Sequence, residues 1–297
     1  MSAVYFDLSI NDDDRREKLY AGDLCVYSAR KSTIALCEFA RQLTEEAFAP
    51  YHPCDAQHEM SVEQYVSILA GLKPKFIHHP RCKDLIPALL SDMGCDLDQT
   101  YFDVPRLRTA TSGDYLRSGL AYAFKPHRDT WYSPPMCQLN WWLPIYPFES
   151  DSAMAIHPQY WDRVIQNSSH EFNYQDWNEN GRRQAAQHVT KDTRRQSEAL
   201  EEIEMDPQLR LVTPPDGMII FSAAHLHSTV DNTTGQTRLS IDFRTVHLGD
   251  LAIRHGAPNI DSHCSGTTIG DYLRGSNLTH VPESVASMYR DGAPAAV

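Results

Sequence analysis

Apolar residues recur at helical spacing in the first third of the chain. Between Lys31 and Phe48 they return every three or four positions, at Leu36, Phe39, Ala40, Leu43 and Ala47. This stripe predicts an amphipathic helix over 31–48, because such positions share one face of a helix.

Two more helices are expected before residue 100. Ser61 and Gln64 have the spacing of a capping box, which predicts a helix beginning at Ser61. Its apolar stripe consists of Val62, Tyr65, Val66 and Leu69. Pro80 and Pro87 bracket a further, shorter helical candidate.

Short strand-like runs replace this pattern from about residue 101. They are Leu120–Phe124, Met136–Leu143, Ser152–Ile156, Leu209–Val212, Met218–Phe221 and Thr237–Val246. Most are bounded by Pro, Gly, Asn or Asp. Six short strands with long gaps favour a barrel or jelly roll over a βαβ repeat.

No repeat or linker divides the chain, so we expect one domain over 1–297. It would comprise a mainly helical part (1–100), a core (101–250) and a C-terminal extension (251–297). Within the core, 166–206 is polar and reads as a surface insertion, partly helical near 194–205. Such an insertion is either a lid or binding loop, or a solvated excursion.

Composition narrows the function classes. Of 297 residues, 41% are hydrophobic and 22% charged, as in soluble globular proteins. Lys and Arg number 27 against 39 Asp and Glu, a net charge of −12. This acidity argues against nucleic acid and anionic membrane surfaces as partners.

Other signals point to the cytoplasm. No apolar run is long enough to span a bilayer, and the first residues lack the pattern of a secretory signal. The seven scattered cysteines are typical of reduced thiols.

The sequence contains no phosphate-binding glycine loop and no serine-hydrolase elbow, so it lacks the usual markers of nucleotide-driven and serine-hydrolase chemistry.

Candidate chemistry begins with His127 and Asp129. Residues two apart on a strand point to the same side, so the imidazole and the carboxylate can converge on one ion. Alone, this pair is a common pattern that favours a surface or hydrogen-bonded pair over a metal site.

A second group of residues strengthens the metal interpretation. A turn at Asp216 and Gly217 leads into an apolar strand that delivers His225 and His227. Two histidines and one carboxylate with open positions form the facial triad of non-haem Fe(II) oxygenases.

The strand that follows has an unusual polar face. Arg238, Ser240, Asp242 and Arg244 alternate with apolar residues and share one side of this strand. A buried polar face of this kind predicts an enclosed anion held by Arg238.

Together these pieces resemble the phytanoyl-CoA dioxygenase-like family of Fe(II)/2-oxoglutarate-dependent oxygenases. The resemblance covers roughly residues 100 to 247. It rests on His127-x-Asp129, Asp216-Gly217, His227 with Asn232, and Arg238 with Ser240. The segment 157–161 departs from the family pattern, which there usually contains Pro-Gly-Ser-His.

The resemblance implies a fold and a chemistry. The fold would be mainly β with flanking helices (α+β), around a double-stranded β-helix (jelly-roll, cupin-like) core. Fe(II) would be bound by His127, Asp129 and His227, with 2-oxoglutarate and O2 as co-substrates. The enzyme would hydroxylate or otherwise oxidise a C–H bond and release succinate and CO2. Asp129 disfavours halogenation, because related halogenases have Gly or Ala there.

Family spacing also assigns the anion site and chooses between two histidines. Arg238, with Ser240, would bind the distal carboxylate of 2-oxoglutarate, and Asn140 or Gln138 would line its pocket or serve as buried amides. The distal ligand precedes the Asn by five residues and the Arg by eleven, which selects His227. His225 would then either support the metal ligands from behind or line the pocket.

The substrate is expected to be a small molecule, such as an amino-acid-derived, sugar-like or natural-product intermediate. Candidate contacts, each with an ordinary core or surface role as the alternative, are Trp131, Tyr132, Arg128, Arg244 and His225. Two rival functions stay open: a cupin-type metal enzyme that does not use 2-oxoglutarate, and a catalytically silent jelly-roll binding protein.

Overall fold

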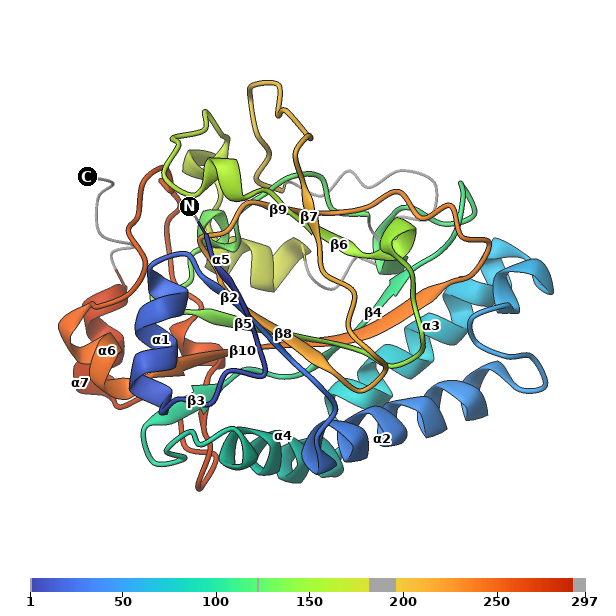
Figure 1. Ribbon diagram of the computed structural model, residues 1–297, viewed down its shortest axis with the longest axis horizontal. Coiled ribbons are helices and arrows are strands. Elements are labelled where there is room, and N and C mark those ends of the chain that lie inside the picture. The colour runs from blue at the N-terminus through green and yellow to red at the C-terminus, as the bar shows by residue number, and fades with distance from the viewer. Residues whose placement is uncertain (1, 122, 182–195, 291–297) are drawn as a thin grey trace.

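The computed structural model describes residues 2–121, 123–181 and 196–290 and has three layers (Figure 1). Helices α2, α3 and α4 cover one face of a large sheet, and a small sheet lies on the other face. The described helices are α1 (Asp12–Tyr20), α2 (Lys31–Phe48), α3 (Val62–Ile77), α4 (Pro80–Asp92), α5 (Tyr174–Asp176), α6 (Leu248–Ile253) and α7 (Glu283–Ala286).

The two sheets form the core. The large sheet contains β1 (Val4–Phe6), β2 (Leu24–Tyr27), β3 (Thr100–Phe102), β4 (Arg106–Ala110), β5 (Leu139–Pro144), β8 (Met218–Ser222), β10 (Arg238–His247) and β11 (Leu273–Arg274). The small sheet has the order β7 (Leu209–Arg210), β6 (Met154–Ile156), β9 (His227–Thr229). The expected fold class, mainly β with flanking helices around a jelly-roll core, is confirmed.

Strand β10 organises the large sheet. It pairs antiparallel with β5 along one edge and with β4 and β3 along the other. Its leucine, isoleucine and phenylalanine side chains are fully buried in the main core, as the alternating pattern predicts. The opposite face of β10 is therefore left for the polar residues.

Apolar side chains join the two sheets. Leu24, Val26, Trp142, Ile219 and Phe221 of the large sheet form one buried cluster with Ile156 of β6. The clustering of these residues fixes the small sheet against β2, β5 and β8. Strand β9 is thereby held close to β8, where the rings of Phe221 and His227 have centroids 5.2 Å apart.

The predicted helices are confirmed, with one difference. Helix α2 has the predicted bounds, and α3 begins at a capping box in which Ser61 and Gln64 exchange hydrogen bonds of 3.1 and 3.3 Å. Helix α4 continues through Pro87 to Asp92. Pro87 is thus inside the helix, where helix packing against the core outweighs the lost backbone donor.

The strand predictions were less complete. Five of the six runs contain strands, but 119–121 is a 3-10 helix and the described residues of 120–124 form no strand. Strands β1, β2 and β11 come from outside 101–250, so the sheet is wider than the segment expected to form the core.

The polar insertion 166–206 is short of regular structure. Its described part contains α5 and brief 3-10 and π turns, and residues 196–205 form no helix. The helix expected near 194–205 is therefore wrong over the described residues. Residues 182–195 lie outside the described residues.

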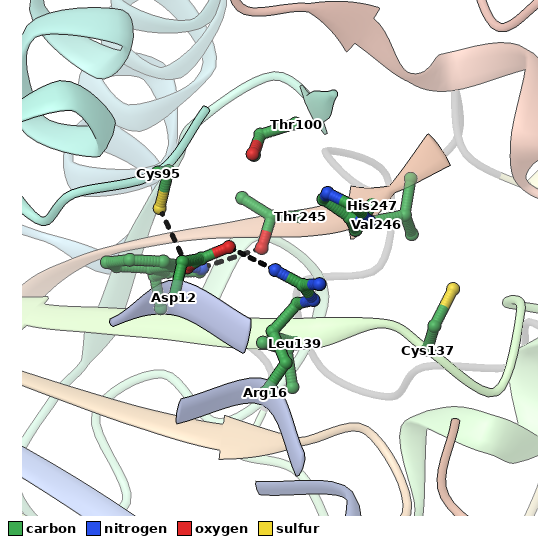
Figure 2. A pocket seen from close by; sticks show the side chains of 10 residues that line it. Asp12, Arg16, Cys95, Thr100, Cys137, Leu139, Thr245, Val246 and His247 are labelled. Atoms are coloured by element: carbon green, nitrogen blue, oxygen red, sulfur yellow. Dashed lines mark hydrogen bonds and ion pairs between the residues drawn. The ribbon is translucent and has the colours of Figure 1, made fainter. Parts of the chain in front are cut away.

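A small cavity lies beneath α1, on the core side of the sheet (Figure 2). Its volume is about 10 Å³, and it lies between Asp12 and Arg16 of α1, Cys95, and Thr245 and His247 of β10. The cavity has room for about one water molecule. It is too small for an organic substrate, so the substrate site must be sought elsewhere.

All seven cysteines are buried and free, as expected of reduced thiols. No helix in the described ranges combines the length and apolar character needed to cross a bilayer.

Candidate metal centre

Two histidines enter the site from neighbouring backbone segments. His227 begins β9, and His127 forms an isolated antiparallel bridge with it. Directly opposite residues of an antiparallel pair project to the same side of the sheet. The two imidazoles therefore emerge together, with ring centroids 4.4 Å apart.

Asp129 reaches the same point by a different route from the one expected. His127 and Asp129 do not lie on one continuous strand, because Asp129 opens a 3-10 helix over Asp129–Tyr132. This turn brings the carboxylate back towards the two rings. Asp129 Oδ1 lies 3.5 Å from His127 Nε2 and 3.9 Å from His227 Nε2.

These distances suit a metal ion. The three ligand atoms lie within 4.8 Å of one another, and all three side chains are mostly buried. Ligands about 2.1 Å from an ion and at right angles to each other lie about 3 Å apart. The observed separations, up to 4.8 Å, exceed this by at most about 1.8 Å, so a modest contraction would complete coordination by a facial triad.

Backbone carbonyls determine which nitrogen of each imidazole carries the hydrogen. His127 Nδ1 lies 2.8 Å from the Lys125 carbonyl oxygen, and His227 Nδ1 lies 3.0 Å from that of His225. Because a carbonyl only accepts, each Nδ1 carries the proton and each Nε2 keeps its lone pair. Burial, with His127 nearby, lowers the pKa of His227 to about 4, which keeps the ring neutral for metal binding.

The second oxygen of Asp129 has its own partners. Asp129 Oδ2 lies 3.4 Å from Gln138 Nε2 and 3.6 Å from Arg244 Nε. Burial opposes ionisation of Asp129, but Arg244 and the two imidazoles outweigh it and hold the pKa of the carboxyl well below its usual range. Oδ1 is thus left for an ion while Oδ2 is held by the protein.

Arg238 is a buried arginine on the polar face of β10, the face that also carries Arg244. Arg238 is 8% exposed, and its guanidinium lies 5.3 Å from the ring centre of Trp142. It donates a 2.7 Å hydrogen bond to Ser240 Oγ. Among the described residues no carboxylate pairs with it, and its Nε has no hydrogen-bond partner.

A buried guanidinium without an anion destabilises the folded protein. Burial lowers the pKa of Arg238 to about 10, and the nearby Arg108 adds to the effect. A buried cation normally has an anionic partner. Arg238 and Ser240 therefore fit a bound carboxylate, which satisfies the unpaired donors.

The two predicted pocket amides lie beside the metal ligands. Gln138 Nε2 donates to Asn140 Oδ1 at 3.0 Å as well as facing Asp129. Gln138 Oε1 accepts a 2.7 Å hydrogen bond from Tyr272. Gln138 thus connects the candidate ligand Asp129 to Tyr272 through hydrogen bonds.

Two of the predicted substrate residues are structural. Trp131 is fully buried and donates a 2.8 Å hydrogen bond from its indole to Asp261. Arg128 is 1% exposed and pairs with the other oxygen of Asp261 at 3.0 Å. Both side chains belong to the core, because their polar atoms are fully used there.

The other three substrate candidates have distinct places. The ring of Tyr132 meets His127 edge-on, with centroids 5.7 Å apart, so it lies at the metal site. Arg244 pairs with Asp103 at 3.2 Å and faces Asp129, so its charge is already neutralised. His225 turns its fully buried ring against Trp161, with centroids 4.5 Å apart, and lies outside the metal cluster.

Several residues at the site were missed by sequence reasoning. Phe172 packs against Tyr132 with centroids 5.0 Å apart, and the Ser197 carbonyl accepts the Tyr132 hydroxyl at 3.0 Å. The described ends of the polar insertion therefore reach the metal site. Phe172 and Trp177 stand out as aromatic residues in a polar stretch, and that signal could have found them. Asp261 and Tyr272 carried no such signal.

Comparisons with known proteins give distant matches only. No family model matches the chain, and no curated protein does. Among solved structures, EvdO2 from Micromonospora carbonacea var. aurantiaca is 13% identical, covering 83% of this chain and 94% of its own, with a TM-score of 0.45.

Two other structures are comparably remote. The non-heme alpha ketoglutarate dependent epimerase SnoN from nogalamycin biosynthesis is 14% identical, covers 80% of this chain and 84% of its own, and has a TM-score of 0.38. The non-heme monooxygenase ThoJ is 12% identical, covers 72% of this chain and 70% of its own, and also has a TM-score of 0.38. At this distance the likeness carries no functional argument, and the chemistry must be argued from the chain's own site.

Proposed function

We propose that this chain is an Fe(II)- and 2-oxoglutarate-dependent oxygenase that oxidises a C–H bond of a small molecule. The observation that carries this proposal is the pairing of two features. Three ligand atoms of a facial triad converge within 4.8 Å, and a buried arginine on β10 has no carboxylate partner among the described residues. The triad alone would fit many metal enzymes.

The donor set favours iron. Two neutral imidazoles and one carboxylate suit Fe(II), and monodentate binding by Asp129 leaves further positions for other ligands. When bound, Fe(II) with 2-oxoglutarate and O2 supplies the oxidising power, with release of succinate and CO2. The protein residues contribute placement, charge and exclusion of water.

Arg238 and Ser240 would bind the distal carboxylate of 2-oxoglutarate. The guanidinium provides parallel donors, and burial strengthens its attraction for an anion. With that end held, the 2-oxo acid end would be directed along the polar face of β10 towards Asp129. Asn140, opposite Arg244, and Gln138 lie at the Asp129 end of that face and would limit the orientation of the 2-oxo acid end.

Tyr132 would line the side of the metal site on which the substrate binds. Its ring lies edge-on to His127, and its hydroxyl is held by the Ser197 carbonyl. A substrate C–H bond next to Tyr132 would lie close to the open coordination positions. The acidic composition favours a small molecule over nucleic acid as the substrate, and we expect hydroxylation or a related oxidation.

An anaerobic titration tests the proposal. Metal-free protein receives one equivalent of Fe(II) and then 2-oxoglutarate, while the visible spectrum is recorded. A weak charge-transfer band that saturates with 2-oxoglutarate is the expected result. Fe(II) binding without a band would indicate a cupin-type enzyme that does not use 2-oxoglutarate. Absence of metal binding would indicate a silent binding protein.

A further inference from the structure

Residues 261–272, here called the C-terminal segment, hydrogen-bond to the short turn that carries Asp129. Asp261 binds the side chains on both sides of this ligand, Arg128 at 3.0 Å and Trp131 at 2.8 Å. Ser262 Oγ donates to the Thr130 carbonyl at 2.5 Å, and Thr268 N donates to that of Ser133 at 3.0 Å. The backbone around Asp129 is thus fixed by residues more than 120 positions later in the chain.

The same segment is also connected to the Asp129 carboxylate through Gln138. Tyr272 is fully buried and donates its hydroxyl to Gln138 Oε1 at 2.7 Å. Its place is set by the sheet, because the following strand β11 pairs with β3. Burial raises the pKa of Tyr272 well above its ordinary value, so the phenol stays protonated and acts as a donor.

This hydroxyl determines which way the Gln138 amide points. Since Oε1 accepts from Tyr272, the amide NH2 is directed at Asn140 Oδ1, 3.0 Å away, and at Asp129 Oδ2, 3.4 Å away. A reversed amide would set its oxygen against the carboxylate, and the two acceptors would repel. The phenol therefore maintains a donor on the outer oxygen of Asp129.

We propose that Tyr272 acts through Gln138 as a positioning residue for the metal ligand Asp129. Gln138 and Arg244 hold Oδ2, so Oδ1 is presented to the ion as a single, oriented ligand. Outer hydrogen bonds of this kind orient metal ligands and tune their basicity. This role rests on the proposed metal site and extends it to the C-terminal segment, which carries no family resemblance.

The test uses Tyr272→Phe, which removes one hydroxyl, with Co(II) as the metal probe. We expect Co(II) affinity to fall by about 10- to 100-fold and the visible Co(II) spectrum to change. Tyr289→Phe is the matched control. It removes a buried hydroxyl nearer the C-terminus that donates to the Leu251 carbonyl at 2.8 Å, away from the ligands. Its Co(II) affinity and spectrum should match those of the wild type.

A double-mutant cycle with Gln138→Met tests the route. Because Tyr272 acts through Gln138, Tyr272→Phe should have little further effect on Co(II) affinity in the Gln138→Met background. An unchanged spectrum and affinity in Tyr272→Phe would overturn the positioning role, as would a full, additive loss in the double variant. If the wild type fails to bind Co(II), the metal site itself is wrong and both proposals fall.

Discussion

The backbones of His127 and His227 hydrogen-bond to each other in both directions. His127 N donates to the His227 carbonyl at 3.0 Å, and His227 N donates to the His127 carbonyl at 2.9 Å. The pair fixes the register between two distant segments. A slip of one residue would turn one imidazole to the opposite face, so the site depends on this pairing.

This register separates the roles of His227 and His225. His227→Ala removes a ligand and should abolish metal binding at micromolar metal. His225→Ala should keep the metal, because only the backbone carbonyl of His225 orients His227. The lost ring leaves a cavity beside Trp161, so the variant should lose about 2–4 kcal/mol of unfolding free energy.

Metal content after reconstitution and thermal unfolding measure these two effects separately. Loss of metal from His225→Ala, with His227→Ala still loaded, would exchange the two assignments.

Asp129→Ala tests the carboxylate ligand. Removal of Asp129 leaves two imidazoles, and we expect Fe(II) affinity to fall by at least about 100-fold and 2-oxoglutarate turnover to vanish. Isothermal titration and succinate release are the measurements. Asp151→Ala is the control, because that carboxylate pairs with Arg210 on the surface. Full turnover by Asp129→Ala would refute the triad.

Local patterns predicted much of this molecule. Helix α2 and the alternation of β10 could be read from the sequence because their periods follow burial directly. The same periodicity identified Arg238 and Ser240 as neighbours on one face. The polar side of a buried strand was itself the signal for a ligand.

Non-local packing explains what the sequence could not predict. Arg128 lies between the two residues of the metal motif and Trp131 follows it, yet hydrogen bonds to Asp261 hold both side chains in the core. Strand β2 has no alternation to reveal it, because all four of its residues are buried between sheet and helices. Tyr272 is an ordinary aromatic residue until β11 places it against Gln138.

Lowering the pH should reduce the unfolding free energy of the metal-free protein, and His157 should contribute to this loss. This histidine is fully buried, with Nε2 3.1 Å from Ser228 Oγ, and burial lowers its pKa to about 4 from 6.5. Between pH 6.5 and 4 the unfolded chain takes up the proton and the folded protein does not. Unfolding free energy should therefore fall as pH decreases, by up to about 1.4 kcal/mol per pH unit for this group.

Urea unfolding at several pH values, compared with His157→Gln, isolates that contribution. The variant should show a shallower decline over the same window. An identical decline in both proteins would mean that His157 is not the group responsible.

Arg238→Met distinguishes a ligand-binding arginine from a structural one. In the free protein Arg238 is a buried cation without a carboxylate partner among the described residues, so an apolar side chain of similar length should leave stability unchanged or raise it. Binding should respond in the opposite way. We expect about a 100-fold loss of 2-oxoglutarate affinity, because a buried charged hydrogen bond contributes about 1.5–3 kcal/mol.

Both properties can be read from one thermal-shift series with and without 2-oxoglutarate, in the presence of Mn(II). The wild type should gain stability as 2-oxoglutarate binds, and Arg238→Met should not. Arg210→Met, which breaks the surface pair with Asp151 and a 3.4 Å hydrogen bond to the Ser150 carbonyl, should behave as the wild type. A strong loss of stability in Arg238→Met without 2-oxoglutarate would instead make Arg238 part of the scaffold, since its charge would then already be satisfied by the protein.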